Sequence, residues 1–359
     1  TSGSTGHPKG VVMTHRGAIS TLMSWHFGLR VLDVMGLGPV PYVDKNNQPY
    51  QPCQLVSVPF FHVSGTHGGL LLALWSGTKL VIMKKWDPPE AVRLIELEKV
   101  SRFGGVPTMA AEILGEAKKV GAKLESIRLI DTGGAARPAD QAREMAVSIP
   151  HVLTGTSYGM TETNALGIAI RGKEYLENPE VTGRLIAPLA EMRIVDEFDN
   201  DVEIGDVGEL VLKSAANMRC YLNKDAETSE VLKDGWLYTG DLAKIDKNEL
   251  ITLVDRKKNI IIRGGENISA QEVQTAILEH PDVIEAAIFA LPNERLGEIV
   301  GACVFCGETS NADGDSLKEF LRKSLAAYKI PEHIWFKKKP LPRVASEKID
   351  VEALKKEYS

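Results

Sequence analysis

The first ten residues combine glycine, hydroxyl and lysine side chains in a way that suits the binding of an anion. They read Thr-Ser-Gly-Ser-Thr-Gly-His-Pro-Lys-Gly. Glycines free the backbone to turn its N–H groups onto a phosphate, the hydroxyl groups add hydrogen-bond donors, and Lys9 supplies a positive charge. No Gly-x-x-x-x-Gly-Lys-Ser/Thr register occurs, so this is not a Walker A loop. Because an apolar run follows at residues 11–13, we expect an ordered phosphate-binding loop beside a strand and not a flexible linker.

Further stretches carry groups that could bind or activate a nucleotide. They are Tyr-Gly-Met-Thr-Glu at 158–162, Tyr-Thr-Gly-Asp at 238–241, Asp-Arg-Lys-Lys at 255–258 with Gly-Gly-Glu-Asn-Ile at 264–268, and a lysine at 348. Taken singly, each has a simpler explanation. Thr-Glu after a glycine is common at a helix N-cap, Thr-Gly-Asp is typical of a turn, and basic residues in a charged segment are usually solvated. Their order along the chain carries more information than any one of them.

Together with residues 1–10, these stretches resemble the signature motifs of the adenylate-forming enzymes: acyl- and aryl-CoA synthetases, firefly-luciferase-like proteins and nonribosomal adenylation domains. The five matches stand in family order and extend from Thr1 to Lys348, over essentially the whole chain. The resemblance implies that a carboxylate attacks ATP while magnesium and positive charge neutralise the α-phosphate and pyrophosphate leaves. The implied cofactors are ATP, Mg²⁺ and CoA, and the implied partners are these molecules and a small carboxylic acid.

The resemblance assigns a role to each matching residue. Thr161 is expected to donate to the α-phosphate, Glu162 to bind Mg²⁺, and Tyr158 to stack on adenine. Asp241 would accept from both ribose hydroxyls, and Arg256 would reach ribose and phosphate. The residues expected to bind ATP or AMP are Thr1, Ser2, Gly3, Ser4, Thr5, Gly6, Lys9, Gly133, Gly134, Ala135, Tyr158, Gly159, Thr161, Asp241 and Arg256.

The C-terminal matches imply a part of the molecule that moves. Lys258 falls at the family's hinge position, and Gly264 and Gly265 would help to admit CoA. Lys348 would bridge the substrate carboxylate and the α-phosphate, a role that suits a point charge on a flexible stem. The family motif has glycine directly before this lysine, where the present chain has Glu347.

His62 lies in Pro-Phe-Phe-His-Val-Ser-Gly, at a position where acyl- and aryl-activating members carry an aromatic residue or histidine near the substrate carboxylate. The expected catalytic residues are therefore Lys348, Thr161 and His62. Amino-acid-activating relatives generally carry Asp near this position to hold the α-ammonium group. No carboxylate stands here, so we expect a plain carboxylic acid. The glycines and leucines of residues 65–72 either leave room for an acyl chain or pack a helix on a sheet.

The elements that must position these residues alternate between strand and helix from residue 54 to 155. Strands are expected at 54–58, 79–83, 102–103, 127–130 and 151–153, and helices at 88–100, 108–119 and 138–147. Such β-α repeats predict a parallel sheet with ligands in the loops beyond the carboxyl ends of its strands. Three loops rich in small residues are expected there, at 104–105, 132–135 and 154–163.

The pattern changes twice further along the chain. Strand-like runs at 191–195, 208–213 and 250–254 without long helices predict a smaller, largely antiparallel part. A capping box then opens a helix at Ser269, strands follow at 283–290 and 299–305, and a helix with apolar residues at 317–325 precedes a strand at 333–337. The expected fold class is α/β. A large domain with a parallel β-α sheet (1–182) and a β-rich subdomain (183–254) precedes a small mobile α+β domain (255–359), with residues 255–258 as linker.

Composition excludes several classes of protein. The 359 residues carry 42 basic and 48 acidic side chains, a net charge of −6, which argues against a nucleic-acid partner. Four cysteines do not make a disulfide framework in a chain of this length, and Cys303 and Cys306 are expected on opposite faces of one strand. The apolar run at 69–83 is interrupted at 76–79, too short to span a membrane, and is expected in the core. The oligomeric state cannot be read from these features.

We therefore predict an ATP-dependent acid–CoA ligase, with a medium- or long-chain fatty acid as the first expectation for its substrate. The alternatives are an aryl- or hydroxycinnamate-CoA ligase, an acyl-AMP ligase that feeds a carrier protein, and an inactive nucleotide-binding fragment. Because the chain starts inside its own expected phosphate loop, we expect an N-terminal truncation that leaves this piece poorly soluble or inactive. A cytoplasmic location is expected, with peripheral-membrane and organellar locations left open. Residues 36–52 are expected to form an exposed excursion.

Overall fold

The computed structural model describes residues 9–134, 139–307, 312–344 and 348–358. Contacts divide the chain into two compact units. Unit 1 comprises Thr1–Thr239 and Ile245–Thr252, and unit 2 comprises Gly240–Lys244 and Leu253–Ser359. The chain thus passes between the units within the long strand β13 (Trp236–Ile245) and within β14 (Ile251–Arg256).

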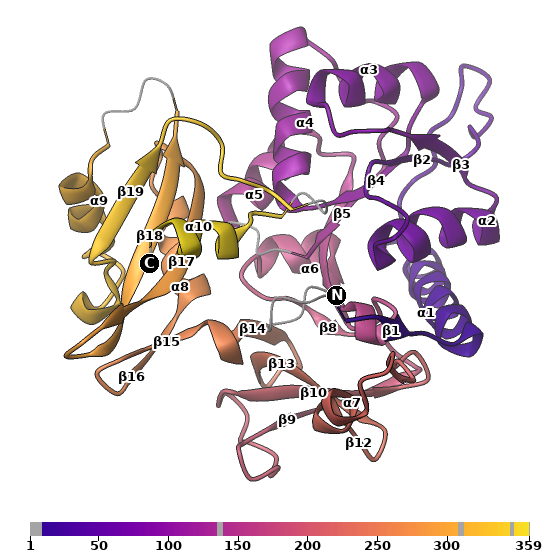
Figure 1. The fold of residues 1–359 in the computed structure, drawn as a ribbon. Helices are drawn as coiled ribbons and strands as arrows, with labels where there is room; N and C mark the ends of the chain where they lie inside the picture. The colour runs from indigo at the N-terminus through magenta and orange to yellow at the C-terminus, as the bar shows by residue number, and fades with distance from the viewer. Residues whose placement is uncertain (1–8, 135–138, 308–311, 345–347, 359) are drawn as a thin grey trace. The chain divides into compact units, whose positions relative to one another are not determined.

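Unit 1 is built on a seven-stranded sheet with the order β3-β2-β4-β5-β6-β7-β8 (Figure 1). Its strands are β2 (Cys53–Val56), β3 (Lys79–Ile82), β4 (Arg102–Gly105), β5 (Leu129–Gly133), β6 (Leu153–Tyr158), β7 (Ile168–Arg171) and β8 (Arg184–Leu185). The pairings from β3 to β6 are parallel, and β7 and β8 are added antiparallel. The predicted parallel sheet is therefore present, with an antiparallel edge.

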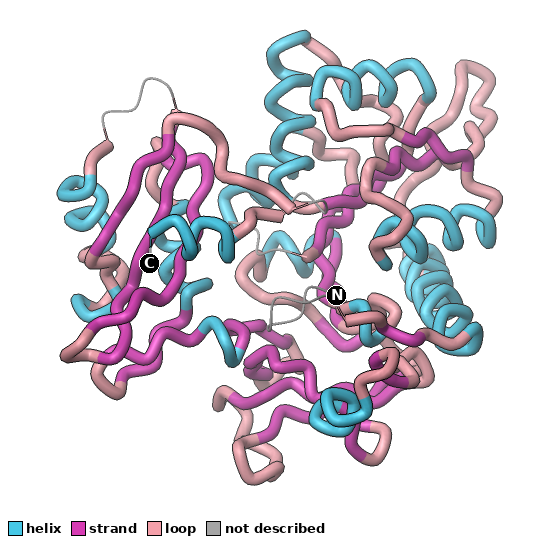
Figure 2. Tube along the Cα trace, in the orientation of Figure 1, coloured by secondary structure: helices cyan, strands magenta, loops and turns pink. Residues whose placement is uncertain are grey.

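Helices cover both faces of this sheet, as Figures 1 and 2 show. On one face lie α3 (Pro88–Glu98), α4 (Pro107–Val120) and α5 (Ala139–Ser148); on the other lie α1 (His15–Val34), the π-helix η1 (Ser64–Leu71) and α2 (Leu72–Ser76). The main core of unit 1 fills the first face, where strand residues such as Leu55, Phe103 and Ile130 pack against Ile95 and Ile113 of the helices. Strand residues alternate between faces, so Arg102, Gly104 and Asp131 point to the opposite side.

The predicted strands and helices are present here with shifted bounds, but each of the three expected loops is at least partly strand. Gly104 and Gly105 lie within β4, Thr132 and Gly133 end β5, and β6 extends through residues 154–158. Main-chain pairing on both sides of β6 outweighs the turn preference of Gly155 and Ser157. The run at 69–83 is not uniformly core, because Leu74 and Trp75 are exposed.

The remainder of unit 1 is rich in antiparallel pairs. A five-stranded sheet has the order β12-β13-β10-β9, with β14 also paired to β13; its further members are β9 (Ala190–Val195), β10 (Gly208–Ser214) and β12 (Leu232–Lys233). Elsewhere β1 (Val11–Val12) pairs with β11 (Cys220–Tyr221), and the short helices are η2 (Thr161–Thr163), α6 (Gly172–Glu177) and α7 (Asp225–Val231). Residues 36–52 carry one isolated bridge, Val43 to Pro49, and are mostly exposed or half-buried, as expected.

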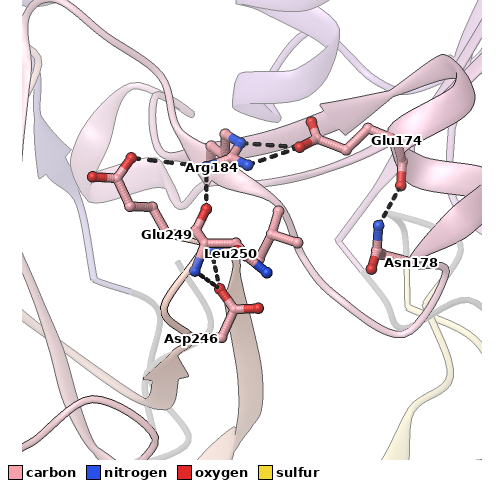
Figure 3. A network of polar contacts seen from close by, with 7 residues as sticks. Glu174, Asn178, Arg184, Asp246, Glu249 and Leu250 are labelled. Carbon is pink, nitrogen blue, oxygen red and sulfur yellow. Dashed lines mark hydrogen bonds and ion pairs between the residues drawn. The ribbon is translucent and has the colours of Figure 1, made fainter.

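A polar network attaches the turn between β13 and β14 to the rest of unit 1 (Figure 3). Arg184 of β8 donates to Glu174 of α6 at 2.8 Å and to the carbonyl oxygen of Asn248. Asp246 accepts the backbone N–H groups of Asn248 and Leu250, each at 2.8 Å, and so closes the turn. The network fixes the place at which β13 and β14 leave unit 1.

Unit 2 is a sheet of order β16-β15-β18-β17, with β19 paired to β18. Its strands are β15 (Ile260–Arg263), β16 (Glu266–Ser269), β17 (Val283–Asn293), β18 (Gly297–Cys306) and β19 (His333–Lys337), and its helical segments are η3 (Lys257–Asn259), α8 (Ala270–Leu278), α9 (Gly314–Leu321), η4 (Ala327–Lys329) and α10 (Val351–Tyr358). Helices α8 and α9 pack on one face and α10 on the other. Cys306 belongs to the first cluster and Cys303 to the second, so they face opposite sides as predicted.

Two local predictions about unit 2 have clear outcomes. Ser269 caps α8, because its hydroxyl oxygen accepts the backbone N–H of Glu272 at 3.0 Å. The expected linker at 255–258 is structured. Asp255 is 5% exposed and accepts from the hydroxyl of Ser269 and the N–H of Gln271.

In the part of the chain that the structure describes, no helix has the length and apolar character needed to cross a membrane.

Candidate nucleotide and acid site

The carboxyl ends of β5 and β6 bring one group of predicted residues together. Gly133 ends β5 in register with Ser157, and Tyr158 ends β6 one residue later. Parallel neighbours end at the same edge of a sheet, so Gly133, Gly134, Tyr158 and Gly159 share that edge. A side chain could not replace hydrogen at two of these glycines. A Cβ atom would lie 2.7 Å from the carbonyl oxygen of Ser157 at Gly133, and 2.4 Å from that of Ala165 at Gly159.

Thr161 and Glu162 follow in the 3₁₀ turn η2 and not in the first turn of a longer helix. Thr161 is half-buried and Glu162 is 6% exposed. The turn is closed by Asn164, which has a φ of 52° and is fully buried. Its side-chain amide donates to the carbonyl oxygen of Ala216 at 2.6 Å, which leaves the amide oxygen to face His67 at 2.9 Å. The tight turn therefore holds Glu162 inside the protein.

The buried carboxylate of Glu162 is held by a residue that the sequence motifs do not include. The phenol of Tyr221 donates to Glu162 Oε1 at 2.8 Å, and both side chains are 6% exposed. Burial first, and the neighbouring carboxylate second, raise the pKa of Tyr221, so its phenol stays protonated and donates. The ammonium group of Lys9 lies over the Tyr221 ring, 4.8 Å from its centre. Lys9, Tyr221 and Glu162 thus form one cluster.

Main-chain bonds tie this cluster to the expected phosphate loop. Val11 and Val12 pair with Tyr221 and Cys220, and the N–H of Leu222 donates to the carbonyl oxygen of Gly10 at 2.8 Å. The N–H of Met218 donates to the carbonyl oxygen of Glu162 at 2.7 Å. The segment 218–222 therefore connects the end of the loop to Glu162. No sequence motif marked it, because the connection appears only when β1 and β11 pair.

The cluster suits a magnesium ion. Among the described residues no group of three or more His, Cys, Asp and Glu is placed to hold a metal. Mg²⁺ does not need such a cage, since proteins commonly bind it through one or two carboxylates together with substrate phosphates and water. Glu162 offers one carboxylate, with one oxygen oriented by Tyr221, beside the cation of Lys9 that a phosphate requires.

A second group of predicted residues meets in unit 2. Arg256 Nε, at the end of β14, lies 3.0 Å from Asp241 Oδ1 in β13, and Asp241 is 5% exposed. Lys348 lies close enough to feel the charges of both residues. Burial first and the positive charge of Arg256 second lower the pKa of Lys348, and the negative charge of Asp241 raises it. Three residues from distant parts of the sequence therefore form one charged site.

The expected hinge and CoA residues occupy turns. Lys258 lies in the 3₁₀ turn η3 directly after β14. Gly264 and Gly265 connect β15 and β16 with φ angles of 60° and 92°, the conformation of a tight hairpin turn that favours glycine. A Cβ atom at Gly265 would meet no other atom within 4 Å, so the tip of this turn is open.

Two histidines belong to the segment that precedes and forms η1. His62 is half-buried, and its Nδ1 accepts the N–H of Ser64 at 3.2 Å. His67 is 4% exposed and reaches Asn164, although no motif singled it out. Because Asn164 presents its oxygen, His67 Nε2 donates; Nδ1 is then a lone-pair acceptor without a hydrogen-bond partner among the described residues. Burial lowers the pKa of His67 despite this hydrogen bond.

Several sequence predictions fall on residues that the structure does not describe. They are Thr1, Ser2, Gly3, Ser4, Thr5 and Gly6 of the expected phosphate loop, Ala135 beside the expected adenine site, and Glu347 before the expected catalytic lysine.

Comparisons with known proteins match both ends of the chain. A family model described as AMP-binding enzyme matches residues 1–222, and one described as AMP-binding enzyme C-terminal domain matches residues 272–348. A feruloyl-CoA synthase of Amycolatopsis is 32% identical over 97% of this chain and 67% of its own length. A long-chain-fatty-acid–CoA ligase of Bacillus subtilis is 29% identical over 97% of this chain and 59% of its own. The chain thus spans about two thirds or less of these relatives.

Solved structures of similar fold include the same kind of enzyme as these relatives. The o-succinylbenzoate-CoA synthetase of Bacillus subtilis, in complex with its acyl-adenylate intermediate, superposes with a TM-score of 0.82 and 28% identity over 99% of this chain and 68% of its own. The same enzyme in complex with ATP and magnesium gives the same values. These likenesses confirm the expected α/β fold with a large and a smaller domain. The chain belongs to the AMP-binding enzyme family, and its relatives are acid–CoA ligases.

Proposed function

We propose that the protein to which this chain belongs is an ATP-dependent acid–CoA ligase. The observation that carries the proposal is the meeting of Asp241, Arg256 and Lys348 in unit 2. A carboxylate that can accept from ribose hydroxyls and two cations that can receive anionic oxygens are the groups that the joining of an acid to ATP requires. The ligase activity of the relatives and the ATP complex of a structural neighbour support it.

In the first step a carboxylate oxygen of the acid attacks the α-phosphorus of ATP. The bond to the bridging oxygen of pyrophosphate breaks, and acyl-AMP and pyrophosphate form. Lys348 lies between the two anions and lowers their repulsion, and Thr161 donates to the α-phosphate. Glu162, oriented by Tyr221, would hold Mg²⁺, which neutralises phosphate charge when bound. Gly133, Gly134 and Tyr158 would receive adenine, and His62 would lie near the substrate carboxylate.

In the second step the sulfur of CoA attacks the acyl carbonyl carbon, and AMP leaves with the electron pair of the broken C–O bond. We propose that the small domain turns about Lys258 between the steps, and that the open turn at Gly264 and Gly265 admits CoA. The division into residues 1–182, 183–254 and 255–359 and a cytoplasmic location belong to the same proposal.

Two classes of acid are candidates for the substrate. A medium- or long-chain fatty acid fits the absence of a carboxylate beside His62, and one relative is a long-chain-fatty-acid–CoA ligase. An aryl or hydroxycinnamic acid is the second candidate, because relatives include feruloyl-CoA synthase and 4-coumarate–CoA ligase. A panel of acids in a pyrophosphate-release assay separates the two classes.

Lys348→Ala tests the central assignment in the full-length protein. We expect it to abolish acid-dependent exchange between ATP and pyrophosphate while sparing the transfer of supplied acyl-AMP to CoA, because only the first step brings two anions together. Lys339→Ala, at an exposed lysine of the same unit, is the control. Exchange that persists in Lys348→Ala contradicts the assignment.

Two other functions predict different results. A ligase that feeds a carrier protein forms acyl-AMP but consumes no CoA. An inactive nucleotide-binding fragment binds ATP and releases no pyrophosphate. Measurement of pyrophosphate release and CoA consumption on the same preparation separates both from an acid–CoA ligase.

A further inference from the structure

A row of charged residues crosses the face of the seven-stranded sheet that η1 and α1 cover. Asp131 of β5, Gly155 of β6 and Arg171 of β7 stand in register on neighbouring strands. Arg171 Nε donates to Asp131 Oδ1 at 3.0 Å and to Oδ2 at 2.9 Å, and Nη2 lies 2.8 Å from Oδ2. The guanidinium group therefore bridges β5 and β7 above β6.

Gly155 is what allows the bridge. A Cβ atom there would lie 2.5 Å from Cγ of Arg171 and 2.6 Å from Oδ1 of Asp131. Two residues closer to the carboxyl ends of β5 and β6, the next row on the same face is Gly133, Ser157 and Ala169. The charged row therefore lies about 7 Å from the glycine edge where the nucleotide is proposed to bind.

Arg102 adds a second guanidinium group to this face. It stands on β4 in register with Leu129, two residues before Asp131. Burial lowers the pKa of Arg102, and the charges of Asp131 and Asp33 partly offset this effect. Asp131 is already engaged by Arg171, and Asp33 pairs with Arg30 at 3.2 Å. Within the described ranges no carboxylate lies within 4.0 Å of Arg102, so its charge has no close ion-pair partner there, whereas Arg171 is paired with Asp131.

On this face the space directly above Gly104 is not filled by neighbouring atoms. A Cβ atom added to Gly104, which stands in register with Asp131, would meet only the carbonyl oxygen of Asp131, at 3.8 Å. On the same face Gln54 of β2 donates to the carbonyl oxygen of Gly68 in η1 at 3.1 Å, and a Cβ atom at Gly68 would meet nothing within 4 Å. The opposite face at Phe103 and Ile130 is closed by the core.

We propose that the Arg102–Asp131–Arg171 row receives an oxygen at the far end of the acid substrate. This inference rests on the proposed acid–CoA ligase function and narrows its substrate class. The favoured acids carry a second acceptor oxygen, as a carboxylate, carbonyl or ring hydroxyl group, at the end away from the reacting carboxylate. Such an oxygen meets the partly desolvated positive charge of Arg102. An alkyl end would cover that charge without offering it a partner, which is unfavourable.

Pairs of acids that differ only at the far end test the proposal in the full-length protein. Suitable pairs are decanoate with decanedioate and cinnamate with 4-hydroxycinnamate, and kcat/KM is measured by pyrophosphate release. We expect the oxygen-bearing acid of at least one pair to be favoured about tenfold or more, the size of effect that a hydrogen bond to a charged group produces. Arg102→Met should reduce this preference about tenfold, mainly by slowing the oxygen-bearing acid.

Arg143→Met, at an exposed arginine of α5, is the matched control and should leave the preference unchanged. A lower melting temperature for Arg102→Met with an unchanged preference would assign Arg102 a structural role and overturn the inference. Equal or greater use of the unsubstituted acids by the unaltered protein would also overturn it, while leaving the ligase function intact. Absence of pyrophosphate release with every acid would instead contradict the proposed function, and the inference with it.

Discussion

At the scale of single residues, the orientation of Glu162 depends on a phenol 59 positions away in the sequence. We expect Tyr221→Phe to keep the packing of the ring beneath Lys9 but to free the carboxylate. The Mg²⁺ concentration needed for half-maximal ATP binding should rise about tenfold, because a hydrogen bond to a charged group is worth about 1.5–3 kcal/mol. Isothermal titration with ATP over a series of Mg²⁺ concentrations measures this without turnover.

Tyr50→Phe provides the control for Tyr221→Phe, because Tyr50 is 43% exposed and stacks on Tyr42 in the exposed excursion. It should leave the Mg²⁺ dependence of ATP binding unchanged. An identical Mg²⁺ dependence for Tyr221→Phe and the unaltered protein would show that Tyr221 does not orient Glu162.

His67 makes the stability of unit 1 sensitive to acid. Its pKa in the folded protein lies below the ordinary value of about 6.5, because burial disfavours the charged ring. As pH falls below that value, the unfolded chain takes up a proton before the folded chain does, so stability is lost. His67→Gln keeps a donor for Asn164 without titrating, and should lose less stability between pH 7.5 and 5.5.

Urea unfolding at both pH values measures this difference. The exposed His333 of unit 2 provides a comparison, because His333→Gln should leave the acid sensitivity of unit 1 as it is. Equal acid sensitivity in His67→Gln and the unaltered protein would contradict a role for His67.

At the scale of elements, β6 depends on a glycine in its middle. Gly155→Ala would bring its Cβ atom within 2.7 Å of the carbonyl oxygen of Ile170 as well as against Arg171 and Asp131. We expect the free energy of unfolding to fall by about 1–3 kcal/mol, the usual cost of overpacking. Gly28→Ala is the matched control: it lies within α1 with nothing within 4 Å of its Cβ position, and should gain about 0.5–1 kcal/mol.

Chemical unfolding of the two glycine variants provides the comparison. A loss in Gly155→Ala no greater than a few tenths of a kcal/mol would mean that the strands relax around the added methyl group, and that Gly155 is not what admits the Arg171 bridge.

Strand β6 also shows which structural features local sequence signals predict and which they do not. Helices such as α3 and α4 were predicted within two residues at each end, because their apolar periodicity and caps are local signals. Residues 154–158 are predicted as part of a loop because the segment is rich in small and polar residues, of which Gly155 and Ser157 favour turns. They form a strand because β5 and β7 supply hydrogen bonds on both sides. Likewise, the partners of Glu162 and Asp131 come from distant strands, which no local pattern shows.

At the scale of the whole molecule, the chain enters unit 2 twice. Residues 240–244 belong to unit 2 although they lie within β13, so Asp241 reaches Arg256 inside one unit. The motifs at 238–241 and 255–258 were predicted as parts of one nucleotide site, and family resemblance was the source of that prediction. Only the folded chain shows that the two motifs come together by the return of β14 alongside β13.

The division into two units predicts that a local lesion in one leaves the other folded. Asp255→Ala removes the acceptor for the hydroxyl of Ser269 and the N–H of Gln271, at 2.7 and 2.9 Å, within unit 2. We expect a loss of about 1–3 kcal/mol in that unit, because the partly buried N–H of Gln271 is left unpaired, while the hydroxyl of Ser269 keeps the carbonyl oxygen of Val254 as acceptor. Hydrogen exchange should then show faster exchange in β15, β18 and α8 and unchanged protection in β4, β5 and β6.

The control is Asp196→Ala, which opens an exposed turn of unit 1 and should leave β15, β18 and α8 protected. Equal loss of protection in both units of Asp255→Ala would show that they unfold as one, and a hinge between independent bodies would then lack its physical basis.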